Sequence, residues 1–299
     1  MKPSLEAISP VDGRYAKITR PLSEYFSESA IIRYRIQTEV EYFIALCELP
    51  LPQLSAFPRE LFPTLRELYL TFEPETAIRI KEIEKETNHD VKAVEYYLKE
   101  WFHGMNLGQF REFIHFGLTS QDVNNTAFPM ALRDAFREVI EPMLDNIIAE
   151  LLTRSQNWKD IPMLARTHGQ PASPTTMGKE FYVFVERLGI QQTLLSTIPF
   201  AGKFGGATGN FNAQHAAYPD IDWIAFANQF VNETLQLERC QTTTQIEHYD
   251  HLAAFFDNLK RINTILIDFC RDMWTYISME YFTQVVKQGE SGSSAMQNC

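Results

Sequence analysis

The sequence of 299 residues lacks a long apolar run, both inside the chain and near Met1. A membrane-spanning helix needs about 20 mostly apolar residues, and a secretion signal carries an apolar stretch of about 7–15 residues near its start. Because neither pattern is found, we expect a cytoplasmic protein that makes no contact with a membrane.

Cysteine is scarce. The four cysteines are Cys47, Cys240, Cys270 and Cys299, and no two of them form a C-x-x-C pair. Zinc ribbons and disulfide frameworks need closely spaced cysteines, so this spacing excludes both. We expect reduced thiols, some of them buried in the core.

Basic residues are also few. The chain has 27 Lys and Arg against 38 Asp and Glu, which gives a formal net charge of −11. A nucleic-acid surface needs clustered positive charge to neutralise phosphates, and this balance argues against such a partner. It does not exclude a small anionic substrate, which needs only a few local donors.

Helix breakers are missing from the last part of the chain. All 15 prolines lie at or before Pro219, and no glycine lies between Gly209 and Gly289. The stretch from about Ile221 to Lys287 therefore favours long helices. Within it, apolar residues recur at steps of three and four and predict one long amphipathic helix from about Leu252 to Phe282. These residues are Leu252, Phe255, Phe256, Leu259, Ile262, Leu266, Phe269, Met273 and Tyr276.

Two further helices are predicted by the same periodicity, at about Ala127–Trp158, with a kink at Pro142, and at about Thr176–Thr197. No segment shows sustained alternation of apolar and polar residues, so we expect an all-α fold built as a long-helix bundle. Residues 1–108 are richer in proline and their helices are shorter. We therefore expect an N-terminal helical domain at 1–108 and an incomplete central bundle at 109–299.

Four polar segments do not fit the helical stripes: Thr87–Asp90, Thr119–Asn125, Arg166–Pro174 and Gly289–Met296. Asp90 is a plausible N-cap for the helical run that follows it, which leaves His89 unexplained. Thr119–Asn125 carries more hydroxyls and amides than capping requires, and a helix start also suits a bound carboxylate.

The segment Arg166–Pro174 holds a histidine between fixed turns. Gly169, Pro171 and Pro174 predict a rigid loop around His168. Imidazole titrates near neutral pH, so a histidine held in a rigid loop is a candidate acid or base. Taken alone, Gly289–Met296 indicates a flexible serine-rich tail.

Two other patterns in the sequence are candidates for ligand sites. Gly202–Gly209 lacks the closing Gly-Lys-Ser/Thr and the preceding strand of a phosphate loop, so it is interpreted as a helix connection. His248 and His251 lie three residues apart with Asp250 between them and could face one metal, but solvated or hydrogen-bonded side chains explain such a group more often. We expect neither a metal ion nor a cofactor.

In this order on long helices, the polar segments resemble the fumarase/aspartase superfamily, whose members eliminate fumarate from a substrate bearing a succinyl group. Thr119–Asn125, Arg166–Pro174 and the Gly-Ser-Ser-x-Met ending at Met296 carry that resemblance. Other stretches look specifically like bacterial adenylosuccinate lyases: Ser9–Tyr15, Thr87–Tyr96, Phe113–Phe116 and Thr244–Glu247. The resemblance implies cleavage of adenylosuccinate to AMP and fumarate, and of the succinylated carboxamide ribotide to AICAR. It also implies a homotetramer.

The resemblance assigns roles to matching positions. Ser293 resembles the base that takes the proton from the succinyl carbon, and His168 resembles the acid that protonates the leaving nitrogen. The remaining roles concern substrate binding. His89 looks like a substrate-orienting histidine, with Asn88 and Asp90 in the same segment, Arg14 and Tyr15 resemble nucleotide contacts, and Thr119, Ser120 and Gln245 look like ligands of the succinyl carboxylates.

The sequence departs from the family's pattern after Met296. The family continues with Met-Pro-x-Lys-x-Asn-Pro, whereas this sequence reads Gln297-Asn298-Cys299. We expect the C-terminal domain to be absent from this chain and the chain alone to be inactive. The alternatives are a non-catalytic helical fragment that associates with full-length subunits, and an argininosuccinate lyase or fumarase relative.

Overall fold

The computed structural model describes residues 5–283 and residue 285, and these residues are mostly helical. They form two compact units. The first comprises the described residues up to Leu144 together with Pro199–Leu252, and the second comprises Asp145–Ile198 and the described residues from Ala253 onward. The boundary expected near Gly108 lies inside the first unit, because the chain beyond it returns to the same core through the first half of a long helix.

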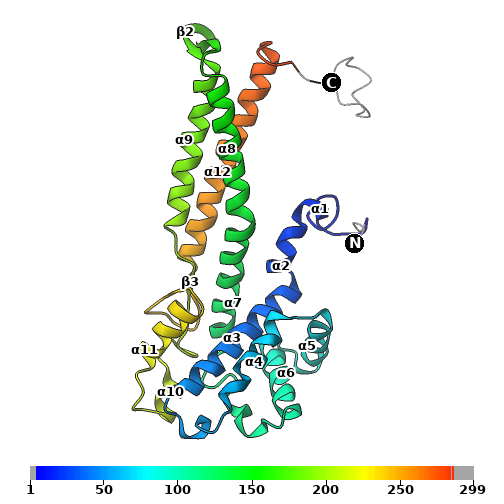
Figure 1. Cartoon of the computed structure of the whole chain (residues 1–299), viewed down its shortest axis with the longest axis vertical. Coiled ribbons are helices and arrows are strands. Elements are labelled where there is room, and N and C mark those ends of the chain that lie inside the picture. Colours follow the sequence, from blue (N-terminus) through cyan, green and yellow to red (C-terminus); the bar gives the residue numbers. More distant parts are fainter. Residues whose placement is uncertain (1–4, 284, 286–299) are drawn as a thin grey trace. The chain divides into compact units, whose positions relative to one another are not determined.

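The first unit contains most of the shorter elements (Figure 1). Its α-helices are α1 (Ala16–Thr19), α2 (Ser23–Phe26), α3 (Glu28–Glu48), α4 (Phe62–Leu70), α5 (Pro74–Thr87), α6 (Asp90–Gly104), α7 (Ser120–Ala135), α10 (Asn212–Ala217) and α11 (Trp223–Asn228). Short 3-10 turns are η1 (Arg20–Leu22), η2 (Pro52–Leu54), η3 (Arg59–Leu61) and η4 (Gly108–Phe113), and π-helical turns are η5 (Phe136–Ile140) and η6 (Gln229–Thr234). Strands β3 (Ala201–Gly202) and β4 (Glu238–Arg239) pair in parallel.

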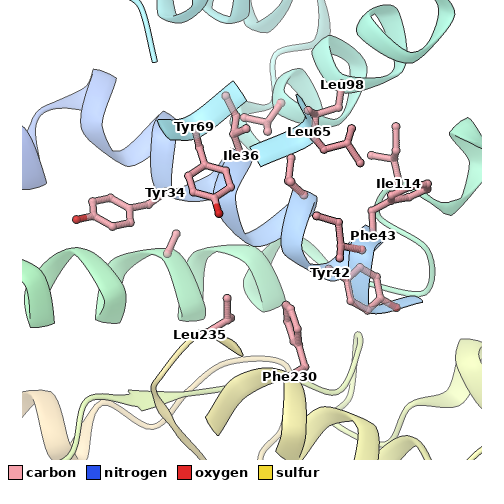
Figure 2. Packing of buried hydrophobic residues seen from close by; sticks show 14 of the residues in the cluster. Tyr34, Ile36, Tyr42, Phe43, Leu65, Tyr69, Leu98, Ile114, Phe230 and Leu235 are labelled. Atoms are coloured by element: carbon pink, nitrogen blue, oxygen red, sulfur yellow. The ribbon is translucent and has the colours of Figure 1, made fainter. Parts of the chain in front are cut away.

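Helix α3 forms the centre of the first unit. It is buried on nearly every side, and Tyr42 and Phe43 are almost completely shielded from solvent. The Tyr42 ring lies 5.4 Å from that of Phe204 and 5.7 Å from that of Phe230, both edge-on, which is a favoured aromatic geometry. Figure 2 shows these α3 side chains among labelled residues of α4, α6 and η6. The core thus joins segments that lie far apart in the sequence.

The second unit is built from three long helices and one hairpin. It contains α9 (Met177–Ser196), most of α8 (Glu141–Asn157) and α12 (Asp250–Ser278), and the antiparallel strands β1 (Pro162–Thr167) and β2 (Gln170–Thr176). Figure 1 shows its three helices running side by side. Phe184 of α9 packs edge-on against Phe269 of α12 with ring centres 5.2 Å apart.

The long helices confirm the predicted periodicity. The helices expected at about Thr176–Thr197 and Leu252–Phe282 correspond to α9 and α12. The helix expected from Ala127 begins earlier, at Ser120, and runs through α7, η5 and α8. The turn before Pro142 is π-helical, which adapts the chain to a residue that has no N–H to donate.

Other local predictions were wrong. Arg166–Pro174 is part of the β1–β2 hairpin and not an irregular loop, with His168 and Gly169 at positive φ as a two-residue hairpin turn requires. The stretch from Ile221 to Lys287 is not helical throughout, because residues 235–249 are mostly irregular despite having no proline or glycine. Helix α6 is capped by His89 and not by Asp90.

Candidate functional site

The start of α7 lies against the start of α6. Ser120 Oγ lies 3.2 Å from His89 Nε2. The backbone N–H of Lys92 donates to His89 Nδ1 at 3.2 Å, so this imidazole is itself the N-cap of α6. Because Nδ1 accepts, the proton of the neutral ring is on Nε2, which then donates to Ser120. The structure therefore brings together two predicted site residues, with one histidine tautomer favoured by the helix.

Asp90 is held by an arginine of α3. Arg35 Nη2 donates to Asp90 Oδ2 at 2.5 Å, and Arg35 Nε donates to Asn124 Oδ1 at 2.9 Å. Burial raises the pKa of Asp90, but the Arg35 charge and the Val91 N–H outweigh this effect, so the pKa lies below its ordinary value. One guanidinium thus links the Thr87–Asp90 segment to the Thr119–Asn125 segment.

A buried ion pair lies two residues beyond Ser120. Lys203 Nζ is 2.7 Å from Asp122 Oδ1, and neither side chain is exposed. The same carboxylate accepts the backbone N–H groups of Thr119, Gly205 and Gly206 at 2.8, 2.9 and 3.0 Å. Gly202–Gly209 does lie between helices α9 and α10, as expected, but the short strand β3 at its start was not expected. The segment also contributes the cation that Asp122 binds.

The segment that carries Gln245 is fixed to α7 by Asn125. The backbone N–H of Glu247 donates to Asn125 Oδ1 at 2.9 Å, and Asn125 Nδ2 donates to the Tyr249 hydroxyl at 2.7 Å. Gln245 itself is exposed. Together with Ser120, Asp122 and Asn124, Asn125 makes the first turns of α7 a common attachment for four other segments of the first unit.

Sequence reasoning missed a second buried carboxylate. Glu39 of α3 accepts from the backbone N–H of His115 at 3.1 Å, and its Oε1 lies 2.5 Å from His115 Nδ1. Burial lowers the pKa of His115, but the charge of Glu39 outweighs burial and raises the pKa above its ordinary value. His115 lies in Phe113–Phe116, where its positive φ gives no sequence signal. Glu39 lies among other charged residues of α3, so no signal in the sequence would have marked it as buried.

The predicted nucleotide contacts lie at the surface of the same unit. Arg14 and Tyr15 are exposed, and the Arg14 guanidinium lies over the Tyr15 ring at 5.8 Å from its centre. Asn88 ends α5 in the left-handed conformation and is also exposed. Among the residues that the structure describes, no hydrogen bond or ion pair joins the side chains of Arg14, Tyr15 and Asn88 to those of His89 or Ser120.

The two residues expected to transfer protons do not lie in the described part of the first unit, where the other predicted site residues are found. His168 is exposed at the tip of the hairpin in the second unit. Ser293 lies outside the described residues. Within the described part of the chain, no group of three or more His, Cys, Asp or Glu side chains is arranged to hold a metal ion, and no helix is long and apolar enough to cross a membrane.

Comparison with known proteins supplies the family. A protein-family model described as Lyase matches residues 13–297. The chain belongs to this lyase family. It is 55% identical over 98% of its length to an adenylosuccinate lyase of Dictyostelium discoideum and 43% identical over 98% to one of Escherichia coli strain K12. It spans 64% of the length of each of these two relatives.

Solved structures support the fold of this lyase. A fumarate lyase from Mesorhizobium sp. BNC1 matches with a TM-score of 0.69 at 21% identity, covering 87% of this chain and 58% of that one. A 3-carboxy-cis,cis-muconate lactonizing enzyme from Pseudomonas putida matches with a TM-score of 0.67 at 20% identity, covering 87% and 56%. The predicted fold class, an all-α bundle of the fumarase/aspartase type, is confirmed.

Proposed function

We propose that this lyase chain forms part of an adenylosuccinate lyase that eliminates fumarate from adenylosuccinate to give AMP, and from the succinylated carboxamide ribotide to give AICAR. The observation that carries the proposal is the 55% identity to an adenylosuccinate lyase over nearly the whole chain. The contact between His89 and Ser120 also supports the proposal, because it joins two segments that are expected to bind the substrate.

The elimination needs a base, an acid and fixed donors. The base removes a proton from the succinyl carbon next to a carboxylate, the C–N electron pair leaves with nitrogen, and the new C=C bond makes fumarate. We assign the base to Ser293 and the acid to His168. A serine hydroxyl is a weak base at its ordinary pKa, so it needs nearby donors and a closed loop.

Charge develops on the carboxylate beside the carbon that loses the proton. Donors fixed before the reaction stabilise that charge without reorganising. We assign this role to Thr119, Ser120 and Gln245, and the orientation of the substrate to His89. Asn88 and Asp90 belong to the same substrate segment as His89, and Arg14 and Tyr15 bind the nucleotide part.

The test uses a full-length chimera, in which this chain is joined to the part of the Dictyostelium relative that it does not match. We expect an ultraviolet change with adenylosuccinate and none with argininosuccinate or malate. His168→Ala should lower turnover about 10²–10⁴-fold, the usual contribution of a general acid. Turnover of argininosuccinate or malate instead would identify a different lyase.

The same chimeras test how subunits contribute to the active sites. We propose that the full-length enzyme is a cytoplasmic homotetramer with active sites shared between subunits. Mixing inactive His168→Ala and Ser293→Ala chimeras should then restore some activity. Absence of recovery despite demonstrated subunit exchange would contradict shared sites.

A further inference from the structure

Burying the ion pair between Asp122 and Lys203 costs free energy, because both charged groups lose their hydration. Both side chains are inaccessible to solvent, and desolvation lowers the pKa of the Lys203 ammonium although the nearby Asp122 charge opposes the change. A buried ion pair often contributes no more stability than apolar residues of the same shape. Stability alone therefore gives a weak reason for this pair, and its hydrogen bonds indicate a different role.

The Asp122 carboxylate is bonded on both oxygens to backbone groups of two segments. Its Oδ2 accepts from the Thr119 N–H at 2.8 Å and the Gly206 N–H at 3.0 Å, and its Oδ1 accepts from the Gly205 N–H at 2.9 Å. Lys203 Nζ also donates to the Gly206 carbonyl at 2.5 Å. The ion pair thus holds the glycine loop (Gly202–Gly209) against Thr119, the residue directly before Ser120.

The glycine loop in turn lies against the segment that leads to Gln245. Gly209 has a φ of +78°, and a Cβ added there would come within 2.3 Å of the Thr243 carbonyl oxygen. The backbones of the loop and of Thr243 therefore touch, with no room for a side chain. Through these contacts the position of Asp122 bears on Thr119, Ser120 and the approach to Gln245.

We propose that Asp122 is a positioning residue, which together with Lys203 aligns the Thr119–Ser120 and Thr243–Gln245 segments toward the carboxylates of the substrate. The assignment rests on the proposed function. Asp122 touches no substrate itself. It sets the direction of donors whose interaction strengthens as negative charge develops, so its loss lowers kcat more than it raises KM.

Three variants of the full-length chimera test the proposal: Asp122→Asn, Lys203→Met and the double variant. Each single change leaves an unbalanced buried group and lowers stability. The double variant removes both charges, so it should recover most of the lost stability. An amide accepts with only one of its two polar atoms, so the double variant keeps at most the backbone bonds to one of the two carboxylate oxygens and also loses the Lys203 bond to the Gly206 carbonyl. We expect its kcat/KM to fall about 10²-fold, as a misplacement of about 1 Å can cause.

A control removes an exposed pair in the second unit. Asp257→Asn, which breaks the contact to Lys260, should leave kcat/KM within about twofold, since exposed pairs contribute little. Full recovery of kcat in the double Asp122/Lys203 variant would overturn the positioning role, because the pair would then be needed only for folding.

Hydrogen exchange on the 299-residue chain separates this inference from the proposed function. In the double variant, we expect the amides of Gly205 and Gly206 to exchange at least about tenfold faster. Unchanged exchange would overturn the inference even in an active enzyme. Faster exchange in this chain, together with a wild-type chimera that lacks lyase activity, would instead contradict the proposed function while the contact of Asp122 with the loop remained established.

Discussion

The two units of this chain are held together in different ways. The first surrounds α3 with a continuous aromatic and aliphatic cluster and also buries the charged groups of Arg35, Glu39 and Asp122. The second consists of long helices, and within the described part of α12 only Phe255, Asn258, Ile262 and Ile265 are buried. Residues that bind or orient a substrate need rigidly packed neighbours, and the core of the first unit provides them.

Large apolar side chains remain uncovered in the second unit. Phe256, Ile267 and Trp274 of α12 are 54%, 52% and 76% exposed. Leu266, Ile267, Cys270 and Trp274 line a depression of about 470 Å³ on this helix. Exposed apolar surface of this kind marks an interaction face or an aggregation risk. The first unit thus has a closed core, whereas the apolar face of α12 is uncovered in the single chain, and we expect the second unit to gain stability where another surface covers that face.

The largest effect is expected from the core of the first unit. Phe43→Ala removes a ring that packs edge-on against Phe57 and Phe102, and the surrounding helices cannot close the cavity. We expect a loss of about 3–5 kcal/mol in the free energy of unfolding, measured by denaturant titration. Phe256→Ala is the matched control in the second unit and should cost about 0.5 kcal/mol or less. Equal losses would remove the contrast between the units.

A smaller effect is expected where the second unit is tightly packed. A Cβ at position 178 would lie 2.2 Å from the Ser155 carbonyl oxygen and 2.6 Å from Lys159 Cα, both of them backbone atoms. We expect Gly178→Ala to cost about 1–3 kcal/mol, as overpacking usually does.

Gly189 of the same helix gives the control for this prediction. No atom lies within 4 Å of a Cβ added there. Gly189→Ala should raise the free energy of unfolding by about 0.5–1 kcal/mol, the usual difference between the two residues in a helix. If both variants behaved alike in thermal unfolding, the approach of α8 to α9 at Gly178 would be looser than the structure indicates.

A further contrast concerns pH. Because the Glu39 carboxylate raises the pKa of His115, protonated His115 stabilises the first unit. This contribution is complete below the unfolded pKa of about 6.5 and is lost as pH rises through the raised folded pKa. The difference in unfolding free energy between the wild type and Glu39→Gln should therefore shrink from pH 6 to pH 9. A difference that stayed constant from pH 6 to pH 9 would show that His115 is neutral in the folded state over this range.

The main helices could be predicted from the sequence because their apolar residues recur with helical periodicity. Pairings between residues far apart in the sequence could not be predicted in this way. The stripe from Leu252 to Tyr276 predicts α12, because one face of a helix must be covered. The β1–β2 hairpin has no apolar alternation. The backbone N–H groups of Met177 and Gly178 donate hydrogen bonds to the carbonyls of Ile161 and Trp158 and close the base of the hairpin. No local sequence pattern predicts these bonds.

For the candidate site, the sequence predicted some of the residues that lie together but not the long-range ion pair. His89 and Ser120 were both assigned to the substrate, and the structure places them in contact. Asp122 and Lys203 are 81 positions apart in the sequence, so their pairing depends on how α7 and the glycine loop pack. The sequence predicts that the polar segment Thr119–Asn125 binds the substrate. The structure shows that Asp122 in this segment instead binds Lys203 and backbone N–H groups of the same chain.

The smallest effect on stability is expected at Trp274, and it tests whether the second unit depends on other chains. Its side chain is largely exposed, so Trp274→Glu should change the free energy of unfolding of the dilute chain by no more than about 0.5 kcal/mol. A charge on the apolar face of α12 should nevertheless weaken association, because burying an unpaired carboxylate is costly. We expect light scattering to show a lower mass for Trp274→Glu at the same concentration. Thr275→Glu adds the same charge to the neighbouring exposed residue and should retain more of the association. An unchanged mass for Trp274→Glu would mean that this face is not where chains meet, and the contrast between the units would then lie in their interiors alone.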